Sequence, residues 1–146
     1  MSRAIAVDFD GVIHTYDKGW QNGNIYGGLM PGAVAGLRVL MQKYAVFIHT
    51  SRSPRSVAGW LASPARGGFV TSLDERCDAC LGHGTRAADD DVGDVICDVC
   101  AGTGELRFWS QKGVLLVTNK KYPAIAYIDD RAVRFTSWSD VKAAYS

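Results

Sequence analysis

Two carboxylates, Asp8 and Asp10, follow a short apolar run near the start of the chain. Residues 5–7 are wholly apolar, as in a strand buried on both faces, and Gly11 closes the stretch as a turn residue. Side chains two positions apart on a strand point to the same side, so these carboxylates would lie together. Because they repel each other, such a pair is useful mainly around a cation or a reacting group. An acidic turn after a core strand is the simpler alternative.

The rest of the chain supplies elements that could hold this pair at the edge of a sheet. Apolar runs alternate with helical spacings of apolar residues, which predicts parallel strands joined by helices. In such sheets, ligands bind just beyond the carboxyl ends of the strands. We expect an α/β fold with a Rossmann-like, three-layer parallel sheet. The predicted elements after the first strand are helices at about 31–43 and 54–62 (capped by Ser53), strands at 45–49, 114–118 and 124–128, and a short closing helix with capping residues Ser137 and Asp140.

A segment rich in glycine, asparagine and aromatic residues, 15–29, separates the first strand from the first helix. Its turn residues predict a short hairpin or flap. The aromatic side chains Trp20 and Tyr26 could line a substrate, although packing against the body of the protein is the commoner role.

Polar residues follow the other predicted strands at the same relative position. Thr50 follows the second strand, Asp129 and Asp130 follow the fourth, and Lys121 lies in the loop after the third. This set, in this order, resembles the haloacid dehalogenase (HAD) superfamily of Mg²⁺-dependent phosphohydrolases, over residues 4–62 and 108–136. The matching motifs are D-F-D-G-V-I-H at 8–14, H-T-S-R at 49–52, a lysine, and Y-I-D-D-R at 127–131.

The resemblance implies a mechanism for the hydrolysis of phosphomonoesters. Asp8 would be the nucleophile that forms an aspartyl-phosphate. Asp10 would protonate the leaving group and later activate water. Thr50 would hydrogen-bond a phosphoryl oxygen. Mg²⁺ prefers octahedral oxygen ligands, and the protein candidates are Asp8, the carbonyl of Asp10, and Asp129 or Asp130.

Basic and polar side chains near these acids would meet the anionic substrate. Lys121 is the favoured catalytic lysine, because a lysine, one residue, proline and alanine before the last strand is a common spacing in similar sequences. Lys120 would then be a surface charge or steer the phosphate. Ser51 and Arg52 are candidate substrate contacts, although Arg52 and Arg131 could equally form structural salt bridges.

Four cysteines lie in an internal repeat, C-x-x-C-x-G-x-G, at 77–84 and 97–104. Two such pairs suit a closed tetrahedral Zn²⁺ site, and the glycines would let backbone N–H groups face the sulfurs. The repeat resembles the cysteine-rich zinc modules of DnaJ-type chaperones. His83 would be a bystander, since four cysteines complete the shell; disulfides or a redox switch are the alternatives. The predicted ligands of one structural zinc ion are Cys77, Cys80, Cys97 and Cys100.

Composition and charge change at the same place in the chain. At 146 residues we expect one catalytic domain, formed by 1–66 and 107–146, with a zinc-binding insertion at 67–106. Residues 74–105 hold nine acidic residues and two arginines, a net charge of −7, whereas the remainder holds 14 Lys and Arg and six Asp and Glu, a net charge of +8. A basic body around an acidic metal site favours an anionic substrate.

The insertion leaves the chain after a predicted helix and returns before a predicted strand. Both attachment points should therefore lie at the edge of the sheet away from Asp8. We expect the zinc module to be a scaffold or a partner surface rather than a lid over the site.

No apolar run approaches the roughly 20 residues of a membrane span. Asp8 and Asp10 also interrupt the only apolar stretch at the N-terminus, which does not look like a signal peptide. We expect a cytoplasmic protein without a membrane partner, in which cysteines bind metal rather than form disulfides.

The leading functional hypothesis is a Mg²⁺-dependent phosphatase, a phosphoric monoester hydrolase acting on a nucleotide or a nucleic-acid end. The alternative is a protein-interaction adaptor, whose zinc module binds a protein partner and whose HAD-like body is vestigial. The retained acids and lysine argue against that alternative. Nucleic-acid binding through the zinc module ranks last, because its net charge of −7 would repel phosphates.

Overall fold

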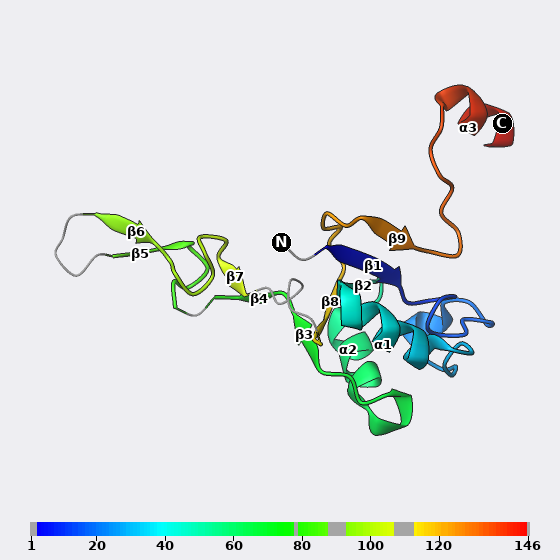
Figure 1. Cartoon of the computed structure of the whole chain (residues 1–146), viewed down its shortest axis with the longest axis horizontal. Helices are drawn as coiled ribbons and strands as arrows, with labels where there is room; N and C mark the ends of the chain where they lie inside the picture. The colour runs from blue at the N-terminus through cyan, green and yellow to red at the C-terminus, as the bar shows by residue number, and fades with distance from the viewer. Residues whose placement is uncertain (1–2, 78, 88–92, 107–112, 146) are drawn as a thin grey trace.

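The computed structural model describes residues 3–77, 79–87, 93–106 and 113–145, and within them a five-stranded sheet organises the body of the protein (Figure 1). The elements of the body are β1 (Ala4–Asp8), α1 (Ala33–Lys43), β2 (Ala45–His49), α2 (Pro54–Ala62), β3 (Thr71–Leu73), β8 (Leu115–Thr118), β9 (Ala126–Ile128) and α3 (Trp138–Tyr145). The strand order is β3-β8-β2-β1-β9, and all neighbouring pairs are parallel. The α/β prediction is confirmed.

The central strands are buried on both faces, as their apolar runs predict. Asp8 pairs with His49 and His49 with Thr118, so the carboxyl ends of β1, β2 and β8 lie level at one edge of the sheet. The residues that follow these strands therefore meet at this edge, which is where an open α/β sheet binds its ligands.

Helices α1 and α2 cover one face of the sheet and close the larger core. Helix α2 begins at Pro54 with Ser53 at its cap position, but the Ser53 side chain makes no capping hydrogen bond. Helix α1 begins at Ala33 rather than near 31, because Gly32 has a left-handed backbone with φ 81°. The buried apolar residues of this core include Ile5, Val7, Phe9, Leu37, Val46, Ile48, Val57, Leu61, Leu115 and Val117.

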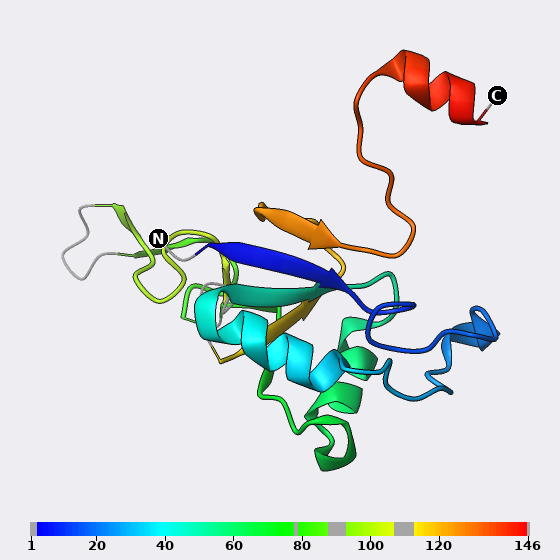
Figure 2. The same ribbon diagram turned by 45° about the vertical axis from the view of Figure 1, so that its right-hand side comes forward.

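The opposite face is covered by the segment that joins β8 to β9. Tyr122 and Tyr127 pack edge-on against Phe47, with ring centroids 5.9 and 6.0 Å apart. Figures 1 and 2 show α3 standing away from this face. A third layer of helices was expected here, but the connecting segment is short and contains Pro123, which disfavours a helix.

Strand β3 is an element that the sequence does not predict. It pairs with β8 at the edge of the main sheet, so residues 71–73 belong to the body, although the expected insertion began at 67. The other expected boundary, at 107, falls outside the described residues. Because β3 runs parallel to β8, the chain leaves the sheet at its carboxyl edge and not, as expected, at the opposite one.

The insertion consists of two small antiparallel ribbons. Strand β4 (Glu75–Arg76) pairs with β7 (Glu105–Leu106), and β5 (Thr85–Ala87) pairs with β6 (Asp94–Ile96). Figures 1 and 2 show these ribbons on the side where β1 begins, away from the end of β1 that carries Asp8. They therefore do not cover the carboxyl edge of the sheet.

None of the helices in the described part of the chain is long and apolar enough to cross a membrane.

Candidate catalytic and metal sites

Three carboxylates converge at the carboxyl ends of β1 and β9. The two strands are parallel neighbours, which brings Asp8 next to Asp129 and Asp130. Their candidate ligand oxygens all lie within 4.8 Å of one another. Asp8 is half-buried and the other two are exposed. Hard divalent cations such as Mg²⁺ bind carboxylate oxygens of this kind, so these three residues could hold one.

Backbone groups lie against the carboxylates of Asp129 and Asp130. The Arg131 N–H donates a 2.7 Å hydrogen bond to Asp129 Oδ1. Asp130 packs directly against Gly11, where an added Cβ would lie 2.1 Å from Asp130 Oδ2. Gly11 also has a φ of 81°, which an L-residue adopts only with strain. The glycine of D-F-D-G thus makes room for a carboxylate that arrives from another strand.

Asp8 is the acid with the most perturbed protonation. Burial raises its pKa from 3.8 to about 6; the N–H of Phe9, 2.9 Å from Oδ1, opposes this, and the negative charges of Asp129 and Asp130 add to it. The ionised cluster is thus costly without a counter-ion. A bound cation would offset that cost.

This cost predicts that Asp8→Asn stabilises the metal-free protein at neutral pH. The folded-state pKa of Asp8 is raised above its unfolded value, so ionisation of Asp8 lowers the free energy of unfolding. This loss of stability is absent below about pH 4, grows as pH rises through about 6, and reaches its full size above that pH. We expect a gain on the order of 1 kcal/mol at pH 7, allowing for solvent screening of this half-exposed group, and almost none at pH 4. Thermal unfolding in a chelator measures it, with Asp17→Asn, an exposed flap acid, as the control. Equal gains at both pH values would contradict it.

The carboxylate of Asp10 makes ion-pair contacts away from this group. Arg52 Nε lies 2.9 and 2.8 Å from its two oxygens, and His14 Nδ1 lies 2.9 Å from Oδ1. Arg52, a predicted substrate contact, is 2 % exposed, and His14 is fully buried. Sequence reasoning missed the role of His14. The sequence does place His14 directly after the apolar residues Val12 and Ile13. A polar side chain buried there would need a hydrogen-bond partner, because leaving it unpaired is costly.

Arg52 also contacts the segment predicted to be a flap. Its Nη1 donates a 3.2 Å hydrogen bond to the Asn24 carbonyl, and its guanidinium carbon lies 4.9 and 5.5 Å from the ring centroids of Trp20 and Tyr16. Its Nη2 is buried and has no hydrogen-bond partner among the described residues.

The flap is held in shape by Tyr26, whose hydroxyl accepts from the Lys18 N–H and donates to the Gly19 carbonyl. It contains a short 3₁₀ turn, Gln21–Gly23, and joins the body through a bridge between His14 and Leu29. Tyr26 thus packs within the flap, whereas Trp20 is half-exposed.

Thr50 and Lys121 lie at the carboxyl edge of the sheet. The Thr50 N–H donates to the Thr118 carbonyl, and its Oγ1 accepts from the Arg52 N–H at 3.0 Å, which leaves the hydroxyl proton to donate. Lys121 is exposed, with Nζ 5.2 Å from the Tyr127 ring centroid. Burial, with the positive charge of Lys121, lowers the pKa of His49. Ser51 is exposed at the same edge.

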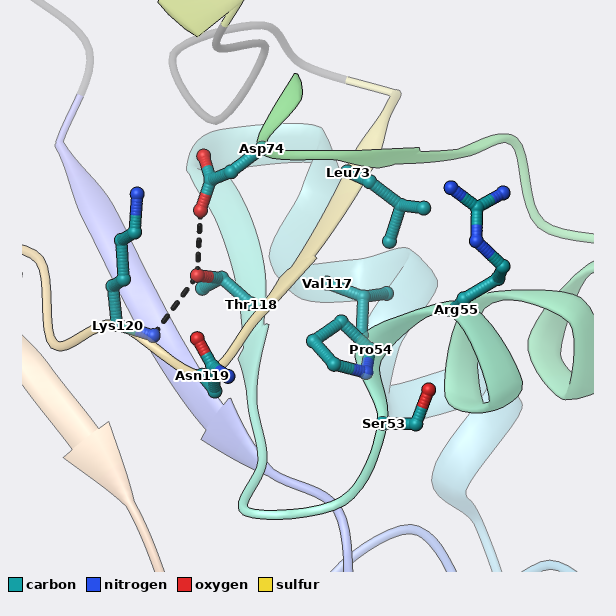
Figure 3. Close-up of a pocket in the computed structure, with 9 residues that line it drawn as sticks. All are labelled: Ser53, Pro54, Arg55, Leu73, Asp74, Val117, Thr118, Asn119 and Lys120. Atoms are coloured by element: carbon teal, nitrogen blue, oxygen red, sulfur yellow. Dashed lines mark hydrogen bonds between the residues drawn. The ribbon is translucent and has the colours of Figure 1, made fainter. Parts of the chain in front are cut away.

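The neighbouring lysine, Lys120, belongs to a different feature. It lines a cavity of about 300 Å³ beyond the ends of β3 and β8. Figure 3 shows Lys120 and Asp74 on one side of this cavity and Arg55 on the other. Thr118 Oγ1 donates to Asp74 Oδ2 at 2.7 Å and accepts from the Lys120 N–H at 3.0 Å. Lys121 therefore faces the β9 side, where Asp129 follows, whereas Lys120 faces β3.

The four cysteines form a second, separate group. All four are buried, and their sulfurs lie within 4.8 Å of one another. The Cys77–Cys97 and Cys80–Cys100 sulfur distances are 4.0 and 3.7 Å. Sulfurs at about 2.3 Å from a tetrahedral Zn²⁺ would lie roughly 3.8 Å apart. This group could hold a metal ion such as zinc, and it is complete without His83, whose side chain is exposed.

The two cysteine turns repeat one backbone geometry and support each other. The Gly84 and Gly104 N–H groups donate 3.2 Å hydrogen bonds to the Cys80 and Cys100 sulfurs. A Cβ on Gly84 would lie 2.5 Å from the Gly102 carbonyl oxygen, and one on Gly104 equally close to the Gly82 oxygen. Glycine is therefore required where each turn packs against the backbone of the other.

The metal-free thiols differ in protonation. Burial raises the pKa of Cys77 to about 11. Burial acts in the same direction on Cys100, but the Gly104 N–H and the neighbouring thiols outweigh it and lower that pKa to about 6. Metal binding would therefore displace thiol protons, and we expect the affinity to fall as pH falls.

Comparison of the chain with protein-family models, with curated proteins and with solved structures finds no match.

Proposed function

We propose that this protein is a Mg²⁺-dependent phosphomonoester hydrolase of the HAD superfamily, built on a Rossmann-like sheet. The observation that carries the proposal is the convergence of Asp8, Asp129 and Asp130 at the carboxyl ends of β1 and β9, with oxygens within 4.8 Å of one another. Thr50 and Lys121 follow neighbouring strands at the same edge. This combination offers a nucleophile, a cation site, a hydrogen-bond donor and a positive charge, which phosphoryl transfer requires.

In the proposed reaction, a carboxylate oxygen of Asp8 attacks phosphorus and the bond to the leaving oxygen breaks. Asp10 gives that oxygen its proton. Asp10 then takes a proton from water, which attacks phosphorus and releases phosphate and free Asp8. Thr50 and Lys121 would stabilise the phosphoryl oxygens. Mg²⁺, held by Asp8, Asp129, Asp130 and the Asp10 carbonyl, would neutralise charge on the phosphate.

The substrate class that we propose is a nucleotide or a nucleic-acid end. The body carries a net charge of +8, and the zinc module lies away from the carboxyl edge, so a large anionic substrate could approach. Trp20, which is half-exposed and packs over the Arg52 guanidinium, offers a surface for a planar base.

The test is a panel of phosphate esters assayed with Mg²⁺ and with a chelator. Nucleotides, sugar phosphates and oligonucleotides with a 3′- or 5′-phosphate should be compared at equal concentration. We expect Mg²⁺-dependent release of phosphate, fastest from the nucleotide or oligonucleotide group. Absence of release from every ester would refute the phosphatase, and preference for sugar phosphates would refute the substrate class.

A second candidate function, a protein-interaction adaptor, is favoured by the surface of the zinc module. Leu81, Val95, Ile96 and Val99 are each more than half exposed there, and aliphatic side chains of this kind are what a protein partner would cover. In this alternative a protein partner would bind the module, and the body would be vestigial. A folded protein that binds zinc but hydrolyses no ester would support it.

A further inference from the structure

We propose that His14 and Arg52 are positioning residues, which orient the carboxyl group of Asp10 for proton transfer and join it to the flap at 15–29. This inference rests on the proposed phosphatase function, in which Asp10 is the acid. Neither residue need touch the substrate for this role. Both act through hydrogen bonds to the Asp10 oxygens.

The protonation of His14 is set by its neighbours. The Gly27 N–H lies 2.9 Å from Nε2 and donates to it, so Nε2 must be the unprotonated nitrogen. A neutral ring then carries its proton on Nδ1, which donates to Asp10 Oδ1. One backbone N–H of the flap thus decides that His14 presents a donor to the acid.

The orientation of the His14 ring is fixed by packing. It stacks on Phe9 with ring centroids 5.4 Å apart and an interplanar angle of 9°. The rings of Trp60 and Tyr26 approach edge-on at 5.9 and 5.1 Å. A buried imidazole without both hydrogen bonds would be costly here, so the ring has one favourable arrangement.

Arg52 supplies the second constraint, although it lies 42 positions from Asp10 in the sequence. Its Nε–H is shared between the two Asp10 oxygens, and its side chain is almost fully buried. Oδ1 receives both donors, whereas Oδ2 receives only the shared one and keeps a lone pair for a proton. The network therefore assigns the proton-transfer role to Oδ2.

The experiment separates the two hydrogen bonds of His14 by amide substitutions. In His14→Asn the amide nitrogen can replace Nδ1 as donor to Asp10. In His14→Gln the amide lies near Nε2, where its oxygen can accept from Gly27, but no donor from residue 14 reaches Asp10. Each variant is assayed with Mg²⁺ on an alkyl phosphate and on an aryl phosphate with a good leaving group. The measured quantity is kcat/KM, which reports the first phosphoryl transfer.

We expect His14→Gln to lower kcat/KM by about 10- to 100-fold on the alkyl phosphate but less than about threefold on the aryl phosphate, which needs little acid assistance. His14→Asn should recover most of the loss. Equal losses on both esters, or equal behaviour of the two variants, would overturn the positioning role. A merely structural role would lower both activities together.

A matched pair of glycines tests the flap side of the network. A Cβ on Gly27 would lie 2.2 Å from Thr15 Oγ1, a side chain that can rotate away, and 2.9 Å from His14 Nε2, whereas one on Gly28 meets nothing within 4 Å among the described residues. Gly27→Ala should reproduce the selective loss on the alkyl phosphate, and Gly28→Ala should not. Identical behaviour of the two variants would overturn the link, and this pair also serves if His14→Gln does not fold.

A readout independent of activity keeps this inference distinct from the proposed function. Nitrogen-15 NMR of the wild-type protein should show His14 protonated on Nδ1 and unprotonated on Nε2. The opposite tautomer would overturn the network even in an active enzyme. Wild-type protein that hydrolyses no ester but shows the expected tautomer would instead refute the phosphatase, and the positioning role with it.

Discussion

Asp8→Asn should abolish Mg²⁺-dependent hydrolysis of an aryl phosphate, by at least about 10⁴-fold in kcat, while leaving the protein folded. The reason is that the amide of Asn cannot attack phosphorus to form the aspartyl-phosphate. The same variant should be more stable than the wild type without metal at pH 7, since it removes a half-buried charge that lies beside two other carboxylates. Loss of activity together with a gain in stability separates a chemical role from a structural one. Phosphate release and thermal unfolding measure the two effects.

The control variant for this prediction is Asp17→Asn, and Asp10→Asn provides a second test of the mechanism. Asp17 is an exposed flap acid, and its replacement should leave activity within about twofold of the wild type. Asp10→Asn should be severely impaired, and least so with a good leaving group. Activity that survives Asp8→Asn, or that survives complete removal of divalent cations, would show that the mechanism is wrong.

Replacement of Cys97 by serine should remove the metal and unfold the insertion while the body stays folded. Binding of structural zinc is worth about 10–16 kcal/mol in zinc-finger peptides, and in the described part of these ribbons the buried cluster consists of the four cysteines alone. We expect one zinc ion per wild-type chain and none in the variant by elemental analysis. NMR spectra should lose the dispersed signals of the insertion and keep those of the sheet. Wild-type protein without zinc and with four titratable thiols would refute the site.

Two glycines with the same backbone angle provide the control for this effect. Gly84 and Gly32 both have φ of 81°, but only Gly84 faces a backbone oxygen that a Cβ would meet, at 2.5 Å. Alanine at either position incurs the left-handed backbone penalty of about 1 kcal/mol. Gly84→Ala should in addition lower zinc affinity by at least about tenfold, whereas Gly32→Ala should not change it. Competition with a chromogenic chelator measures the affinities.

The strands that carry the candidate site could be predicted because each is an uninterrupted apolar run. Strand β2 begins and ends at the predicted residues, and the proline that opens α2 locates that helix. Strand β3 could not be predicted, since Thr71-Ser72-Leu73 is short and two of its three residues are polar. Its position is determined by pairing with β8, which is a tertiary contact.

The residues of the site were predictable by type, but their contacts were not. The sequence shows Asp8 and Asp10 on one strand end, and it indicates that the four cysteines form one group. It does not show that the Asp10 carboxylate binds Arg52 and His14 instead of joining Asp8. That contact depends on the rotamer of Asp10 and on where the flap lies. Periodicity carries no information about either.

The insertion occupies the crossover between two paired parallel strands, a place that a helix usually fills. Residues 74–114 lie between β3 and β8, and pairing these strands closes that whole length into a loop. A metal ion that joins Cys77 to Cys100 bypasses the residues between them and roughly halves the chain to be closed. Each halving lowers the entropic cost of closure by about 0.6 kcal/mol. Metal binding should therefore slow hydrogen exchange at the amides of β3, although this strand lies in the body and holds none of the cysteines.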